Sequence, residues 1–112
     1  MDFLVETAVY DDRAVITLAG EIDFATSPQL RTALRAFLDQ QDRWLPVYVV
    51  IENVEFIDSA GLSDLMSFRT SYLAKFDRPR LDRDSIVFVR PKQSILRIMR
   101  LSGLDASVGI EL

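Results

Sequence analysis

Residues 58–61 carry the sequence Asp-Ser-Ala-Gly, which combines a carboxylate, a hydroxyl and a small flexible pair. The Ser59 hydroxyl could cap a helix, act as a nucleophile or accept a phosphoryl group. A nucleophilic serine needs an activating base, yet the sequence has no His, and its lysines, Lys75 and Lys92, are distant from Ser59 along the chain. A hydrolase built on Ser59 is therefore disfavoured, and helix capping is the simplest structural role.

Two elements would hold this segment in place. Residues 46–51 form a dense run of β-branched and aromatic side chains, which predicts a central strand covered on both faces. Residues 52–58 are expected to lead out of that strand. From Ser59 onward the apolar side chains take up helical spacing, with Arg69 interrupting the stripe. Ser59 is therefore expected to cap a helix whose positive N-terminal end would also attract an anion.

The other elements are predicted from similar signals along the chain. They are, in order, an antiparallel hairpin at 3–9 and 14–19, a loop at 21–25, a helix after Ser27-Pro28, a strand at 86–89, a helix from Pro91 to Gly103 and a short strand at 108–110. Gly20 is expected to end the hairpin and Ser27 to cap the first helix. The charged segment 77–84 is expected to be a solvated loop.

This order predicts a single α/β domain over residues 1–112. We expect a small mixed β-sheet with an N-terminal antiparallel hairpin and parallel β-α-β crossovers, with the helices packed mainly on one face.

The composition narrows the possible functions. The 112 residues include 13 basic and 17 acidic side chains, so the formal net charge is −4. This acidity, without a basic stripe, argues against direct binding of nucleic acid. No apolar run approaches the roughly 20 residues that span a bilayer, and no signal sequence opens the chain, so we expect a cytoplasmic protein without membrane insertion. The absence of Cys and His removes the usual thiolate, imidazole and disulfide chemistry, which favours an interaction domain over an enzyme.

Three motifs together resemble a known family. The first is Gly-Glu-Ile-Asp at 20–23, the second Asp-Ser-Ala-Gly-Leu at 58–62, and the third the closing Ser-Gly-Leu at 102–104. In this order and spacing they resemble the STAS domain of bacterial anti-sigma factor antagonists, over nearly the whole chain. Each motif alone would be weakly specific.

The resemblance implies a partner-switching function. In that family the unphosphorylated antagonist binds an anti-sigma factor that is also a serine kinase, and a sigma factor is thereby released. The kinase then phosphorylates the antagonist with its own ATP, which ends the binding, and a phosphatase restores it. The resemblance therefore implies no cofactor for this domain itself. It leaves the oligomeric state open.

Carried over to this chain, the resemblance implies that Ser59 is the phosphorylated residue. It also implies a partner-binding surface formed by Gly20, Glu21, Asp23, Thr26, Ser27, Asp58, Ala60 and Gly61. A phosphate on Ser59 would add about −1.5 to −2 charges beside Asp58 and Asp23. The fold would tolerate this charge at a helix N-terminus, whereas a docked partner would be repelled.

The sequence departs from the family pattern at Val50, where Asp or Asn is usual. We expect one polar group fewer near the acceptor, which favours an alternative: a STAS scaffold or transporter-associated subunit without a phosphorylation cycle. Another alternative, a Mg²⁺ site, would require the scattered acids Asp23, Glu52, Glu55, Asp58 and Asp64 to converge.

Overall fold

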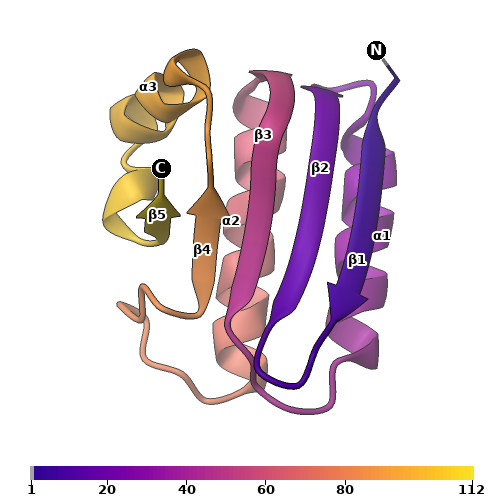
Figure 1. Ribbon diagram of the computed structural model, residues 1–112, viewed down its shortest axis with the longest axis vertical. Helices are drawn as coiled ribbons and strands as arrows, with labels where there is room; N and C mark the ends of the chain where they lie inside the picture. The colour runs from indigo at the N-terminus through magenta and orange to yellow at the C-terminus, as the bar shows by residue number, and fades with distance from the viewer. Residues whose placement is uncertain (1) are drawn as a thin grey trace.

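The computed structural model, which describes residues 2–112, has one five-stranded sheet backed by helices (Figure 1). The elements in chain order are β1 (Leu4–Val9), β2 (Ala14–Ile22), α1 (Ser27–Gln40), β3 (Val47–Ile57), α2 (Ser59–Lys75), β4 (Ile86–Val89), α3 (Gln93–Ser102), the 3-10 turn η1 (Leu104–Ala106) and β5 (Gly109–Glu111). The strands lie in the sheet in chain order, β1 antiparallel to β2 and all other neighbours parallel. The predicted element order and mixed sheet are confirmed.

The helices α1 and α2 lie side by side behind the sheet, and α3 lies toward the β4–β5 edge of the sheet and contacts β3 (Figure 1). Strands β2 to β5 follow one another in a single direction across the sheet. Right-handed crossovers that all advance in one direction place their helices on the same face. The opposite face therefore has no helical cover, and Tyr48 and Val50 of β3 are only half-buried there. The expectation that this strand is covered on both faces was wrong.

Several element ends differ from the prediction. β2 continues through Gly20 to Ile22, and β3 includes residues 52–57. Gly20 adopts a positive φ of 93°, and a Cβ there would come within 2.8 Å of the Asp2 carbonyl oxygen. Glycine thus lets β2 bulge beneath the start of the chain instead of ending the strand. α3 begins at Gln93 rather than Pro91, because Lys92 still has extended backbone.

An aromatic cluster joins α1 to α2. The rings of Phe37 and Phe68 have centroids 5.9 Å apart, and Tyr72 lies 5.8 Å from Phe68. The Tyr72 hydroxyl is fully buried, where it donates to the Leu45 carbonyl at 2.7 Å and accepts from the Leu45 amide at 3.1 Å. Burial raises the pKa of Tyr72, partly offset by the hydrogen bond to Leu45. The cluster holds α1 against α2, the helix that begins at Ser59.

The charged segment 77–84 is not simply a solvated loop. The Asp82 side chain is only 7% exposed and accepts hydrogen bonds from Arg78 and Ser85, both at 2.7 Å. Arg69, which interrupts the apolar stripe of α2, is 8% exposed and donates to the carbonyl oxygens of Ser107 and Arg80. The buried guanidinium of Arg69 is satisfied by backbone carbonyls, and Asp82 by Arg78 and Ser85. These hydrogen bonds hold segment 77–84 against the rest of the domain.

We predict that Asp82→Asn destabilises the fold at neutral pH. Burial alone would raise the pKa of Asp82, but hydrogen bonds from Ser85, Arg78 and the Asp84 amide outweigh it and hold the pKa below 3.8. A carboxyl whose pKa is lower in the folded state stabilises the fold above its unfolded pKa, and this stabilisation is lost as the pH falls through the folded value. Urea unfolding should show a loss of about 1–3 kcal/mol at pH 7 that shrinks below about pH 4.

The exposed neighbour Asp84 provides the matched control. Asp84→Asn removes the same charge without removing the buried acceptor, so it should change the free energy of unfolding by less than about 0.5 kcal/mol. Equal effects of the two variants, or a difference that does not depend on pH, would contradict the role given to Asp82.

Among the described residues, no helix is both long enough and apolar enough to cross a bilayer.

Candidate functional site

The site lies where two parallel strands end side by side. β2 pairs with β3 up to Ile22 opposite Ile57, so the residues that follow each strand meet at one edge of the sheet. The Asp58 amide donates to the Ile22 carbonyl at 3.0 Å. Residues 23–26, before α1, therefore lie against the start of α2.

Asp58, not Ser59, caps α2. One carboxylate oxygen of Asp58 accepts from the Gly61 amide at 3.0 Å, and the other accepts from the Phe24 amide at 3.0 Å. Asp58 thus satisfies a free N–H of the helix and ties the neighbouring loop to it. Because a carboxylate takes the capping position, Ser59 becomes the first residue of α2, and its side chain is exposed. The prediction that Ser59 caps this helix was wrong. Its hydroxyl is not needed for capping and lies at the exposed surface.

The loop before α1 is held by its own polar side chains. Asp23 accepts from the amides of Ala25 and Thr26 at 2.9 and 3.0 Å. The Thr26 hydroxyl donates to the Glu21 carbonyl at 2.9 Å. Thr26 occupies the N-cap position of α1, one residue before the predicted Ser27. The Ser27 hydroxyl instead donates to Asp64 of α2, so it links the two helices.

The residues predicted to contact a partner are brought together, but they are not equally accessible. Glu21 and Ser59 are exposed. The partly exposed members are Asp23, Thr26, Asp58 and Ala60. The buried members are Gly20, Ser27 and Gly61. The three buried residues lie beneath the surface and position it, and only the other six are accessible to a partner.

Phe24 is a surface feature that the sequence analysis missed. Its side chain is 83% exposed at the tip of the loop, while its amide donates to Asp58. Phe56, on β3 just before the site, is 46% exposed. Exposed aromatic side chains are enriched at the centres of protein interfaces. The signal in the sequence was a large aromatic residue inside a predicted loop.

The acids near the site do not form a metal centre in the described part of the chain, where no group of three potential ligands converges. Glu55 instead pairs with Lys92 at 2.8 Å, and Glu52 with Arg90 at 3.5 Å. The sequence has no His, and both lysines contact other residues: Lys75 donates to the Leu38 carbonyl and Lys92 to Glu55. In the described structure neither lysine therefore acts as a general base for Ser59.

Comparison with known families decides the classification. A family model described as "STAS domain" matches residues 5–112. This chain belongs to the STAS domain family.

Relatives of this STAS domain carry a common description. An anti-sigma-B factor antagonist of Staphylococcus aureus (strain NCTC 8325 / PS 47) is 36% identical over 62 residues, which are 55% of this chain and 56% of the relative. The match thus spans about half the length of that relative.

Solved structures share the fold. An anti-sigma factor antagonist from Mycobacterium paratuberculosis aligns with a TM-score of 0.77 at 22% identity, covering 98% of this chain and 86% of the other. SpoIIAA in its unphosphorylated form aligns with a TM-score of 0.70 at 20% identity, covering 99% and 89%. At these identities the likeness shows the fold alone, and it agrees with the predicted mixed sheet.

Val50 does not lie near Ser59 in this STAS domain. It is in the middle of β3, paired with Thr17 and Val89, eight positions before Asp58. At about 3.3 Å per residue, that separation along a strand is roughly 25 Å. The expectation that Val50 removes a polar group beside Ser59 was therefore wrong, and this departure from the family pattern no longer favours a scaffold.

Proposed function

We propose that this STAS domain is an anti-sigma factor antagonist that switches partners through phosphorylation of Ser59. In the unphosphorylated state it binds an anti-sigma factor with serine kinase activity and thereby frees a sigma factor. Phosphorylation ends the binding, and a phosphatase restores it. This role is regulatory, not catalytic, and it places the domain in the cytoplasm. The observation that carries the proposal is the exposed Ser59 at the first position of α2, directly after a carboxylate whose two oxygens each accept a hydrogen bond from a backbone amide.

Relatives support the proposal. The Staphylococcus aureus relative is described as an anti-sigma-B factor antagonist. SpoIIAA, which has the same fold, has been solved in unphosphorylated and in phosphorylated forms. Phosphorylation of a protein with this fold therefore has a precedent, and Ser59 is the accessible hydroxyl at the position that the family motif suggests.

The transfer itself needs no base from this chain. The Ser59 Oγ would attack the γ-phosphorus of ATP held by the kinase, the bond to the β-phosphate oxygen would break, and ADP would leave. The hydroxyl proton would pass to a base on the kinase. The carboxylate next to Ser59, that of Asp58, already accepts hydrogen bonds from two backbone amides, so we assign both the base and the Mg²⁺–ATP to the partner.

The geometry also explains how one modification could act on binding but not on folding. A phosphate at the first turn of α2 would face the favourable end of the helix dipole. It would stand beside Asp58 and on the same surface as Glu21 and Phe24. A partner that buries Phe24 would have to bury the new charge as well, at a large cost in desolvation.

Incubation with ATP and the anti-sigma factor kinases of the source bacterium tests the proposal. One of them should add a single phosphate to the wild type, and fragment mass spectrometry should place it on Ser59. Ser59→Ala should remain unmodified, and Ser63→Ala, one turn further along α2, should be modified like the wild type. Absence of modification by every such kinase would reject the switch in favour of a scaffold without a phosphorylation cycle.

A further inference from the structure

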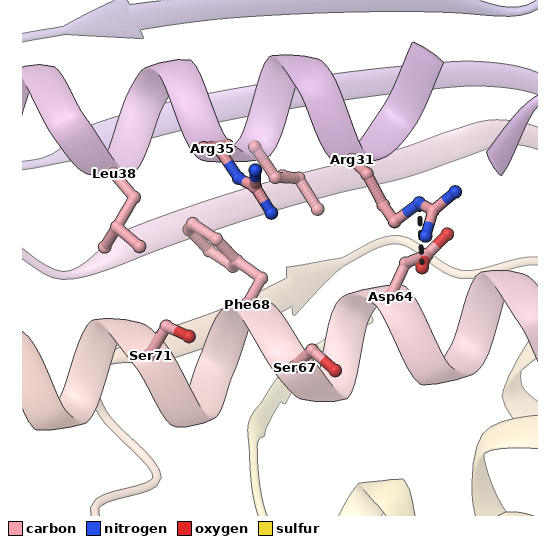
Figure 2. A pocket seen from close by; sticks show the side chains of 8 residues that line it. Arg31, Arg35, Leu38, Asp64, Ser67, Phe68 and Ser71 are labelled. Carbon is pink, nitrogen blue, oxygen red and sulfur yellow. Dashed lines mark ion pairs between the residues drawn. The ribbon is translucent and has the colours of Figure 1, made fainter. Parts of the chain in front are cut away.

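A groove runs between α1 and α2 (Figure 2). Its floor is apolar, formed by Leu34, Leu38 and Phe68. Two side chains from each helix form its walls: Arg31 and Arg35 from α1, Ser67 and Ser71 from α2. Because serines are short, the α2 wall is low. Phe68 lies at the bottom of the groove and is 6% exposed, while Leu38 in the same floor is half-buried.

The size of the groove favours a side chain over a free metabolite. Its cavity is about 120 Å³, well below the roughly 300–1,000 Å³ of sites that enclose small molecules. A hole of this kind between two helices accepts one apolar side chain from a third element, as a knob packs into a hole. The groove therefore has room for an anchor residue of a polypeptide.

The charge of the groove is opposite to that of the whole chain. Arg35 has no ion pair within residues 2–112, and Arg31 reaches Asp64 only at 3.9 Å. At the other end, Lys75 donates to the Leu38 carbonyl. A line of cations beside an apolar floor, on a chain of net charge −4, is complementary to an acidic amphipathic segment.

The groove continues toward Ser59. A second hollow, of about 300 Å³, is lined by Phe24, Ser27, Pro28, Arg31, Ala60, Ser63 and Asp64. It shares Arg31 and Asp64 with the groove. One partner surface could therefore cover the start of α2 and extend along the helices.

We propose that the α1–α2 groove binds an acidic helical segment of a protein partner, with one apolar side chain on Phe68 and carboxylates at Arg35 and Arg31. Arg31 and Arg35 are one helical turn apart, so acids spaced four residues apart on the segment would meet both. The identity of the partner as the anti-sigma factor rests on the function proposed above. The groove itself does not depend on that identity.

Titration of the isotopically labelled domain with synthetic peptides tests the groove directly. The probe is an amphipathic helix of about 18 residues with one leucine and, beside it, two glutamates spaced four residues apart; a matched peptide carries lysines in place of these glutamates. The acidic peptide should shift the amide resonances of α1 and α2 around Phe68, and the lysine peptide should not. Arg35→Glu should weaken the acidic peptide about tenfold. Replacement of the leucine by alanine should weaken it as well.

A pair of arginines elsewhere provides the control. Arg97 and Arg100 on α3 are exposed and line a hollow without apolar residues. Arg97→Glu makes the same charge change as Arg35→Glu but should leave peptide binding unaltered. The proposal is overturned if both variants act alike, if both peptides bind alike, if neither binds, or if hexanoate alone binds as tightly as the acidic peptide.

Kinase assays on the Arg35→Glu variant distinguish failure of this proposal from failure of the proposed function. If Arg35→Glu raises the KM for the protein substrate about tenfold while Ser59 is still modified at saturation, both proposals stand. If Arg35→Glu is modified with an unchanged KM, the anti-sigma factor does not use the groove, and the switch at Ser59 survives. If Ser59 is never modified but the acidic peptide binds in the groove, the switch fails and the groove stands.

Discussion

Ser59→Glu is expected to weaken binding of the anti-sigma factor by about 30-fold or more while leaving the fold intact. A carboxylate at this position imitates part of the charge of a phosphate and adds to that of Asp58 and Glu21. Leaving an unpaired charge in an interface costs about 2 kcal/mol or more, which corresponds to at least roughly 30-fold in Kd. The first turn of a helix tolerates the same charge, so the melting temperature should not fall. Calorimetric titration and thermal unfolding measure the two effects.

Two variants make this expectation specific. Ser59→Ala removes the hydroxyl without adding charge and should bind nearly as tightly as the wild type. Ser94 is exposed in the first turn of α3, so Ser94→Glu places the same charge at another helix start and should not affect binding. Equal affinities for Ser59→Glu and Ser59→Ala would exclude the charge switch.

Gly61→Val is expected to have the largest effect on stability. A Cβ at Gly61 would overlap the Cγ2 atom of Ile22 and lie 3.0 Å from Cγ1 of Ile57. Ile22 and Ile57 are both buried, so neither can move aside easily. We expect a loss of about 3 kcal/mol in the free energy of unfolding, which lowers the melting temperature by roughly 10 °C. Chemical denaturation and thermal unfolding would measure this.

A control substitution at the neighbouring Ala60 distinguishes a packing effect at Gly61 from an effect of helix propensity. Ala60 is only partly buried, so Ala60→Val should cost no more than about 0.7 kcal/mol, the range of intrinsic helix propensities. If Gly61→Val costs no more than Ala60→Val, the close approach of α2 to the end of β2 is not what requires glycine. The atoms that a side chain at Gly61 would meet belong to Ile22 and Ile57 of the same domain.

The sequence alone determined the element order and the parallel pairing. The apolar spacing changes from strand to helix at Ser59, and strands separated by helices must pair in parallel with right-handed crossovers. The motifs at 20–23 and 58–62 also identified the segments that meet at the site. These features could be predicted because they follow from local periodicity and from connectivity, neither of which depends on a particular side-chain contact.

Only the tertiary structure decided the role of each residue within those segments, such as which residue caps α2. Ser59 and Asp58 are both good helix caps, and the choice depends on Asp58 also reaching the amide of Phe24, 34 residues earlier. The exposure of Phe24, the distance of Val50 from Ser59 and the basic groove along α1 and α2 likewise arise from packing between elements distant in the sequence. Such contacts have no local signature, because they depend on how the helices and strands are placed relative to one another.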